Sequence, residues 1–265
     1  MQKTVRKILR AVADHDPDYH DMYADASEAL FARLYLEWIM RHAEAAGIRP
    51  PATLLEAGCQ AGRLVVPFAK LGFQVTGIDT SGYALRRAKE HLKAAGVEAR
   101  LMRGNLIDVL RTQPTLRYDI VVCAEVVYLS REYRTMLQAL AAAVRPGGLL
   151  CVSHRPQCYY LVEAIRAGDL AAAAQVLSRR EGAFRDSAYY NWQTRDDLRA
   201  LYASLGLAQI TIHPIDRLAW LGAINVARLT PEQREQWLQL ELQMPEEAMA
   251  ASRYALVVAA RPNGT

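Results

Sequence analysis

The residues best placed to do chemistry are an acid and two glycines within residues 53–64. A short apolar run leads to Glu56, Gly58 and Gly62 follow it, and an apolar pattern with helical spacing begins at Leu64. A strand, a glycine turn and a helix in this order bring backbone N–H groups and the positive end of a helix dipole to one point. The spacing is typical of a turn that binds a ligand.

A second acid, Asp79, closes the next apolar run, at residues 75–79. It would stand at the tip of a second strand, beside the first turn. One carboxylate in that position can accept hydrogen bonds from both hydroxyls of a ribose. The two strand ends together indicate a cofactor that carries a nucleoside.

Composition sets few limits on the partner. The chain has 265 residues, of which 52% are hydrophobic and 23% charged, and a formal net charge of +4. This length can bury a substantial core, and the charge is too small to argue for nucleic acid by itself. The four cysteines form no Cys-x-x-Cys pair, so we expect reduced cysteines and no metal site. With no membrane-length apolar run and no signal peptide, we expect a soluble, cytoplasmic protein.

Apolar runs and helical patterns alternate over the middle of the chain. Strands are predicted near residues 53–57, 75–79, 99–103, 118–124 and 149–153. Helices are predicted from Leu64, between Ser81 and Gly96, and over 131–144. This alternation predicts an α/β fold with a Rossmann-like, doubly wound parallel sheet.

The ends of the chain are expected to elaborate this unit. Residues 1–50 are predicted to form an N-terminal helical extension or lid, with one helix near 5–12 and another beginning at a Ser27 cap. The domain proper would span 51–265. It would carry helical insertions at about 155–190 and 220–250, a helix beginning at Thr194, and final strands near 209–213 and 254–260.

Five short motifs resemble those of the class I S-adenosylmethionine-dependent methyltransferases, in order and in spacing. They are Glu56-Ala-Gly58-Cys-Gln-Ala-Gly62, Gly77-Ile-Asp79, Gly104-Asn105, Tyr118-Asp119-Ile-Val-Val and Arg145-Pro-Gly-Gly148. The resemblance covers roughly Thr53 to Ser153. It implies a seven-stranded sheet with an antiparallel last strand, and S-adenosyl-L-methionine as the cofactor.

The resemblance also implies where the cofactor lies. The glycine turn would face its methionine part and ribose, Asp79 would hold the ribose hydroxyls, and Thr80 would adjoin the adenine. Asn105 and Leu106 match the adenine site, and Ala124 with Glu125 would lie near the methionine end. The complete expected set is Glu56, Gly58, Cys59, Gln60, Gly62, Asp79, Thr80, Asn105, Leu106, Ala124 and Glu125.

Two positions depart from the pattern. Gln60 replaces the middle glycine of the turn, and Asn105 replaces an acid. A glutamine there costs energy if the backbone needs a positive φ, and it could narrow the cleft or reach the cofactor. A dehydrogenase is excluded locally, because its Gly-x-Gly-x-x-Gly turn would need glycines at Gln60 and Arg63.

The reaction needs no obligatory catalytic side chain, because the cofactor itself would carry the activated methyl group. Two candidates could assist: His154 at the end of the fifth strand, and Tyr128 after Glu125. Both also fit structural roles. The aromatic stretch 189–192 could be core or a wall of the cleft, and Tyr19, His20 and Tyr23 could close the cofactor pocket.

We therefore expect transfer of one methyl group to an O, N, S or C atom of a small molecule, by a monomer or homodimer. One alternative acceptor is tRNA, because the layout after the fifth strand broadly resembles the carboxymethoxyuridine tRNA methyltransferases. That resemblance includes the Glu- and Leu-rich helix Leu238–Gln243. Another alternative, motivated by Gln60 and Asn105, is a non-catalytic protein that binds S-adenosylmethionine.

Overall fold

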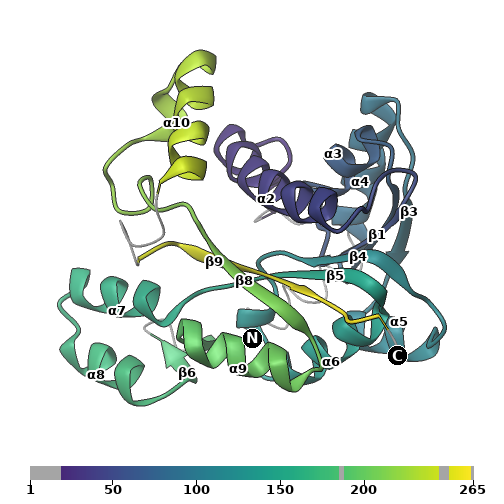
Figure 1. The fold of residues 1–265 in the computed structure, drawn as a ribbon. Coiled ribbons are helices and arrows are strands. Elements are labelled where there is room, and N and C mark those ends of the chain that lie inside the picture. Colours follow the sequence, from purple (N-terminus) through teal and green to yellow (C-terminus); the bar gives the residue numbers. More distant parts are fainter. Residues whose placement is uncertain (1–18, 185–187, 245–250, 264–265) are drawn as a thin grey trace, which may run out of the picture.

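A seven-stranded sheet lies between two layers of helices (Figure 1). This computed structural model describes residues 19–184, 188–244 and 251–263. The helix predicted near residues 5–12 lies outside the described residues.

The strand order is β3-β2-β1-β4-β5-β9-β8. Strands β1 to β5 run parallel to one another, whereas β9 runs antiparallel to both β5 and β8. This confirms the predicted doubly wound sheet with an antiparallel last strand. The bounds are β1 (Thr53–Ala57), β2 (Gln74–Asp79), β3 (Arg100–Arg103), β4 (Tyr118–Cys123), β5 (Val144–His154), β8 (Ala208–Ile215) and β9 (Tyr254–Ala260).

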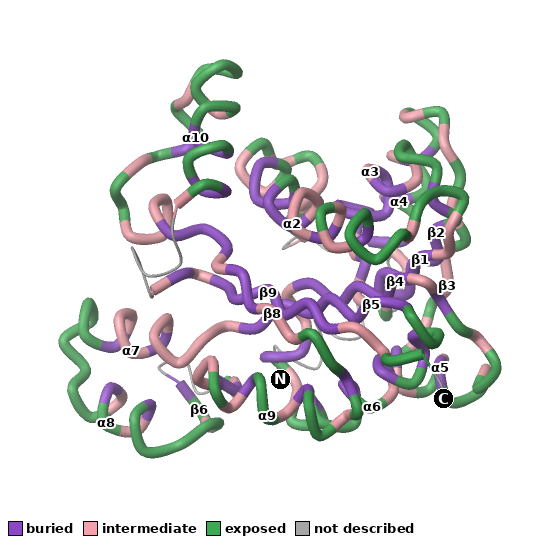
Figure 2. Tube along the Cα trace, viewed as in Figure 1, coloured by how far each residue is buried: buried purple, intermediate pink, exposed green. Residues whose placement is uncertain are grey.

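Both faces of the sheet are covered by helices, so its central strands are buried almost throughout (Figure 2). Successive side chains of a strand point to opposite faces. Accordingly Leu54 packs with the first helical layer and Leu55 with the second. The first layer holds α2 (Ala26–Ala45), α3 (Val65–Lys70), α4 (Gly82–Ala95) and α10 (Pro231–Gln243), and the second holds α5 (Leu106–Thr112), α6 (Tyr133–Ala143) and α9 (Arg195–Ser204).

The helix ends follow local chemistry. Helix α4 is capped by Ser81, whose hydroxyl accepts from the N–H of Ala84, and it closes at Gly96 with φ +67°, as predicted. The Ser27 cap predicted for α2 is wrong. Asp25 takes that position, because its carboxylate accepts from the N–H groups of Ser27 and Glu28 and carries the charge that a helix N-terminus favours.

Two additions flank the sheet. Residues 155–191 contain α7 (Gln157–Arg166), α8 (Leu170–Ser178) and a hairpin of β6 (Glu181–Phe184) and β7 (Ala188–Asn191). Trp192 is fully buried among Tyr160 and Phe184, and its indole N–H donates to two backbone carbonyls. The aromatic stretch 189–192 therefore contributes to this small core and does not line the cleft described below. The second addition contains a 3₁₀ turn (Val226–Arg228) and α10, which packs on α2.

Candidate active site

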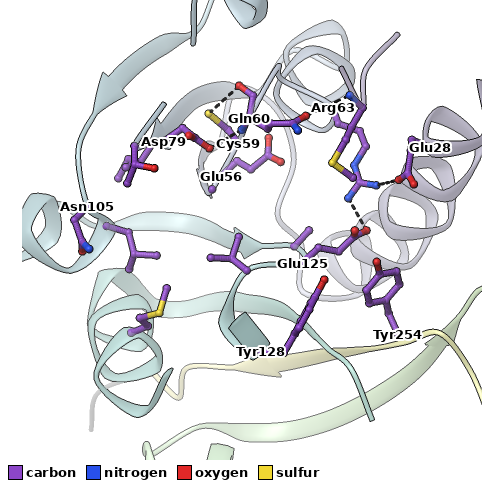
Figure 3. Close-up of a pocket in the computed structure, with 18 of the residues that line it drawn as sticks. Glu28, Glu56, Cys59, Gln60, Arg63, Asp79, Asn105, Glu125, Tyr128 and Tyr254 are labelled. Atoms are coloured by element: carbon purple, nitrogen blue, oxygen red, sulfur yellow. Dashed lines mark hydrogen bonds and ion pairs between the residues drawn. The ribbon is translucent and has the colours of Figure 1, made fainter. Parts of the chain in front are cut away.

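A cleft of about 440 Å³ opens where the carboxyl ends of β1, β2 and β4 meet (Figure 3). Parallel α/β sheets bind ligands at this edge. All the residues that we predicted to hold the cofactor line this cleft, except Gly62. The lining also includes Met22, Glu28, Arg63, Ile78, Gly104, Val126, Tyr128, Met136, Arg155, Arg253 and Tyr254.

Glycine is required at the start of the turn after β1. Gly58 has φ +82°, and a Cβ atom there would lie 2.3 Å from a methyl carbon of Val126. The N–H groups of Gly58 and Cys59 both donate to the carbonyl of Ile78, at 2.8 and 3.0 Å. Gly62 has φ +86° and closes the turn onto helix α3, so it shapes the cleft without lining it.

The carboxylate of Asp79 is held in place by hydrogen bonds from the turn after β1 and from the N-cap residue of α4. Its Oδ2 accepts from the N–H of Gln60 at 2.9 Å, and its Oδ1 accepts from the N–H of Ser81 at 2.8 Å. Each carboxylate oxygen keeps a further acceptor site. A ribose diol could therefore bind here without rearrangement of the side chain.

The structure also brings together the residues that we expect to surround the adenine. Thr80, Asn105 and Leu106 line the cleft. Of these, Asn105 is seen at the end of the cleft opposite Glu28 and Tyr254 (Figure 3). Asn105 has a second task, because its Oδ1 accepts from the N–H of Ile107 and caps α5. That cap gives a local reason for asparagine at this position.

The side-chain amide of Gln60 is engaged by the protein itself, although the residue lines the cleft. Its backbone is left-handed, with φ +44°, and its side-chain amide binds the segment before α2. Nε2 donates to the carbonyl of His20 at 2.9 Å, and Oε1 accepts from the N–H of Met22 at 3.3 Å. Of this segment it is Met22 that lines the cleft, rather than Tyr19, His20 or Tyr23.

Glu56 is a buried acid at the floor of the cleft. Its side chain is 3% exposed, and its Oε2 has no hydrogen-bond partner. Burial is the main cause that raises the pKa of this carboxyl to about 8, and the charge of Asp79 adds to the effect. A cationic group in the cleft would find here an acid that can become its counter-ion.

Sequence reasoning missed an ion-pair cluster at the other end of the cleft. Arg63 lies 2.6 Å from Glu28 and 2.6 Å from Glu125, and its side chain is 6% exposed (Figure 3). Glu125 has φ +63°, and its N–H donates to the hydroxyl of Ser153. The signal was the arginine directly after Gly62, but nothing in the sequence indicated that Glu28 of α2 would reach it.

The two catalytic candidates separate in the structure. Tyr128 lines the cleft within the turn Val127–Leu129, and burial raises the pKa of its phenol. His154 is not brought to the cleft: it is fully buried, and its Nε2 lies 2.9 Å from the hydroxyl of Tyr202 on α9. Burial lowers the pKa of His154 to about 3. It points to the sheet face covered by α9, and so could not take a proton from an acceptor in the cleft.

The described residues were also compared with the requirements of a metal site and of a membrane span. Within residues 19–184, 188–244 and 251–263, no group of three or more His, Cys, Asp or Glu side chains is placed to hold a metal ion. No helix in those ranges is both long and apolar enough to cross a membrane.

Comparison with known proteins agrees with this geometry. Residues 54–148 match the sequence profile of the methyltransferase domain family. The chain is 36% identical over 115 residues to a ubiquinone biosynthesis O-methyltransferase of Bordetella avium, which is 43% of this chain and 46% of that protein. It is 38% identical over 97 residues to the protein of the same name from a Methylobacterium species, which is 37% of this chain and 38% of that protein. The chain thus spans less than half the length of these relatives.

Solved structures resemble nearly the whole chain. Magnesium protoporphyrin IX methyltransferase from Synechocystis PCC 6803 aligns over 98% of this chain and 100% of its own, with a TM-score of 0.57 and 17% identity. A Burkholderia thailandensis 1,6-didemethyltoxoflavin-N1-methyltransferase aligns over 99% of this chain and 91% of its own, with a TM-score of 0.60 and 16% identity. Residues 54–148 thus match the methyltransferase domain family, and the chain as a whole has the fold of the class I S-adenosylmethionine-dependent methyltransferases.

Proposed function

We propose that the protein is an enzyme that transfers a methyl group from S-adenosyl-L-methionine to a small-molecule acceptor. The observation that carries this proposal is the placement of Asp79 beside the Gly58 turn, at the open edge of a methyltransferase fold. A carboxylate that is already held in place and still has acceptor positions on both oxygens suits the diol of a nucleoside.

Each part of the cleft has a task in this proposal. Asp79 would bind the ribose hydroxyls, and Thr80, Asn105 and Leu106 would enclose the adenine. Glu56 would face the methionine ammonium from its buried position. The opposite end, around Tyr128 and Tyr254, would then remain for the acceptor (Figure 3).

For this reaction the main task of the protein would be to align the acceptor with the methyl group. The bound cofactor supplies a methyl group on a positively charged sulfur, which is displaced in line by a lone pair of the acceptor. The acceptor's lone pair would take this methyl group as the carbon–sulfur bond breaks, with the electron pair of that bond left on sulfur and the acceptor's proton released to solvent. The walls of the cleft hold the acceptor on that line, which can be worth about 7–11 kcal/mol.

The attacking atom is proposed to be a hydroxyl oxygen. The two relatives named above are O-methyltransferases by name, and the aromatic rings of Tyr128 and Tyr254 line the end of the cleft left for the acceptor, where a small aromatic molecule could pack. No histidine is among the described residues that line the cleft. An acceptor with an acidic hydroxyl, such as a phenol, would need the least help from a base.

Titration calorimetry with S-adenosylmethionine and S-adenosylhomocysteine tests the cofactor site. We expect both to bind, and Asp79→Ala to weaken binding by about 1.5–3 kcal/mol, or roughly 10- to 150-fold, through loss of charge-assisted hydrogen bonds. Asp108→Ala, at an exposed acid on α5, should leave binding unchanged. A wild-type protein that binds neither molecule would refute the proposal.

Transfer of a labelled methyl group then separates the remaining alternatives. A small-molecule enzyme should methylate members of a panel of phenols and catechols. Labelling of bulk tRNA instead, with binding that falls steeply with salt, would favour the tRNA alternative. Cofactor binding without labelling of either acceptor class would favour a non-catalytic binding protein.

A further inference from the structure

Two arginines from distant parts of the chain meet at the acceptor end of the cleft. Arg155 follows β5 and Arg253 precedes β9, and both line the cleft. Their guanidinium carbons lie 5.1 and 5.3 Å from the ring centroid of Tyr254. Arg155 also lies 4.8 Å from the ring centroid of Tyr128 and 4.6 Å from that of Tyr159. These aromatic rings hold the two cations near one another.

Neither arginine has a close carboxylate partner among the described residues. Arg155 donates from Nη2 to the hydroxyl of Tyr254 at 3.1 Å, but its Nε is buried without a hydrogen-bond partner. Arg253 has only Asp216, at 3.7 Å. Burial raises the pKa of Asp216 to about 6, and its carboxylate lies beyond hydrogen-bonding distance of Arg253. An unpaired buried donor costs free energy unless something binds it.

The acids at this end of the cleft are already engaged. Glu28 and Glu125 both bind Arg63 at 2.6 Å. Arg155 and Arg253 add two positive charges here: Arg155 has no ion-pair partner among the described residues, and Arg253 is influenced by Glu28, Asp216 and Glu125 without a hydrogen bond to any of these carboxylates. In a partly enclosed site, such charges attract an anion more strongly than they would in open water.

We propose that the acceptor carries a carboxylate, which Arg155 and Arg253 bind while its aromatic body lies against Tyr128 and Tyr254. The inference rests on the proposed methyl transfer and deepens it by naming the acceptor class: a small aromatic acid. A guanidinium presents parallel N–H donors that match the two oxygens of a carboxylate, and tyrosine faces suit a flat apolar ring.

The position of the pair favours the acceptor over the cofactor as its ligand. Tyr128 and Tyr254, which the guanidiniums contact, lie at the opposite end of the cleft from Asp79 and Asn105 (Figure 3). A group held there would lie beyond the nucleoside. An interaction with the methionine carboxylate is the competing possibility, and the experiment below distinguishes the two.

Calorimetry on the protein saturated with S-adenosylhomocysteine provides the test. The probes are 3,4-dihydroxybenzoate, 3-(4-hydroxyphenyl)propanoate and 4-hydroxyphenylacetate, each compared with its primary amide, together with phenyl phosphate. We expect at least one carboxylate to bind wild type at least tenfold more tightly than its amide. Arg155→Met and Arg253→Met should each reduce that preference to less than threefold.

The controls separate this inference from the proposed function. The affinity for S-adenosylhomocysteine should change less than threefold in both variants, and Arg111→Met on the exposed surface of α5 should change nothing. Failure of S-adenosylhomocysteine to bind wild type would count against the proposed function. The comparison of acid with amide on wild type needs no variant, so a variant that fails to fold leaves the test intact.

Several results would overturn the inference while the cofactor still binds. They are equal binding of acid and amide, no binding of any carboxylate, and a preference that survives both substitutions. Tighter binding of phenyl phosphate than of every carboxylate would replace the acid class by a phosphate ester. Loss of S-adenosylhomocysteine affinity in Arg155→Met, with the preference unchanged, would assign the arginine to the cofactor.

Discussion

At the scale of single residues, the cleft contains an acid, Glu56, whose ionisation the fold disfavours. Burial is the first cause that raises the pKa of Glu56 from 4.5 to about 8, whereas the nearby charge of Arg63 lowers it. The folded protein thus holds this proton more tightly than the unfolded chain does. The contribution to stability is fully present below pH 4.5 and is lost as the pH rises through about 8.

The same proton should be released when the cofactor binds. The ammonium group of S-adenosylhomocysteine beside Glu56 would favour the carboxylate and lower its pKa, so binding at pH 7 should release roughly 0.5–1 proton. Calorimetry in phosphate and in Tris, which differ in ionisation enthalpy, measures this number. Glu56→Gln should abolish the release. Identical heats in the two buffers for wild type would show that Glu56 does not meet the ammonium.

At the scale of elements, Gln60 connects the first turn of the sheet to the segment before α2. A left-handed glutamine is strained relative to glycine, yet its amide makes two hydrogen bonds to residues 20 and 22. The same segment is held from α4, where Asp21 lies 2.9 Å from His91 and 3.2 Å from Arg87. The strain of the left-handed backbone at Gln60 is thus offset by hydrogen bonds that hold residues 20 and 22 in place beside the cleft.

Gln60→Gly should therefore loosen residues 19–23 without damage to the turn. The backbone strain disappears, but the two hydrogen bonds go with it, each worth about 0.5–1.5 kcal/mol. Hydrogen exchange at the Met22 amide should become at least several-fold faster, whereas exchange in β1 and β4 should stay slow. Gln60→Ala is the matched control, since it loses the bonds and keeps the strain. Unchanged exchange at Met22 in both variants would contradict this account of the substitution.

At the scale of the whole molecule, the features that could be predicted from the sequence are those that short local patterns encode. Alternating strands and helices indicated the sheet, and Gly58 and Asp79 marked its functional edge. Arg155 and Arg253 could not be predicted, because no local pattern joins the end of β5 to the start of β9. His154 was misplaced for a simpler reason. Leu150 and Val152 pack toward α6 and α9, and strand alternation sends His154 to that same face.

The limits of prediction at the first turn have a similar cause. Gln60 was visible as a departure from the glycine pattern, but its partners His20 and Met22 are 40 and 38 residues away in the chain and belong to no recognisable motif. Likewise Arg63 was visible, whereas its contact with Glu28 depends on how α2 packs across the sheet. Residue type identified these positions, and only tertiary packing identified their partners.

The central claim is that a nucleoside sulfonium binds across the ends of β1, β2 and β4. A crystal structure with S-adenosylhomocysteine tests it most directly. The account predicts both ribose hydroxyls within hydrogen-bonding distance of Asp79, the adenine between Thr80 and Leu106, and the sulfur directed toward Tyr128 and Tyr254. A ligand found elsewhere on the protein, or a ribose with no contact to Asp79, would contradict it.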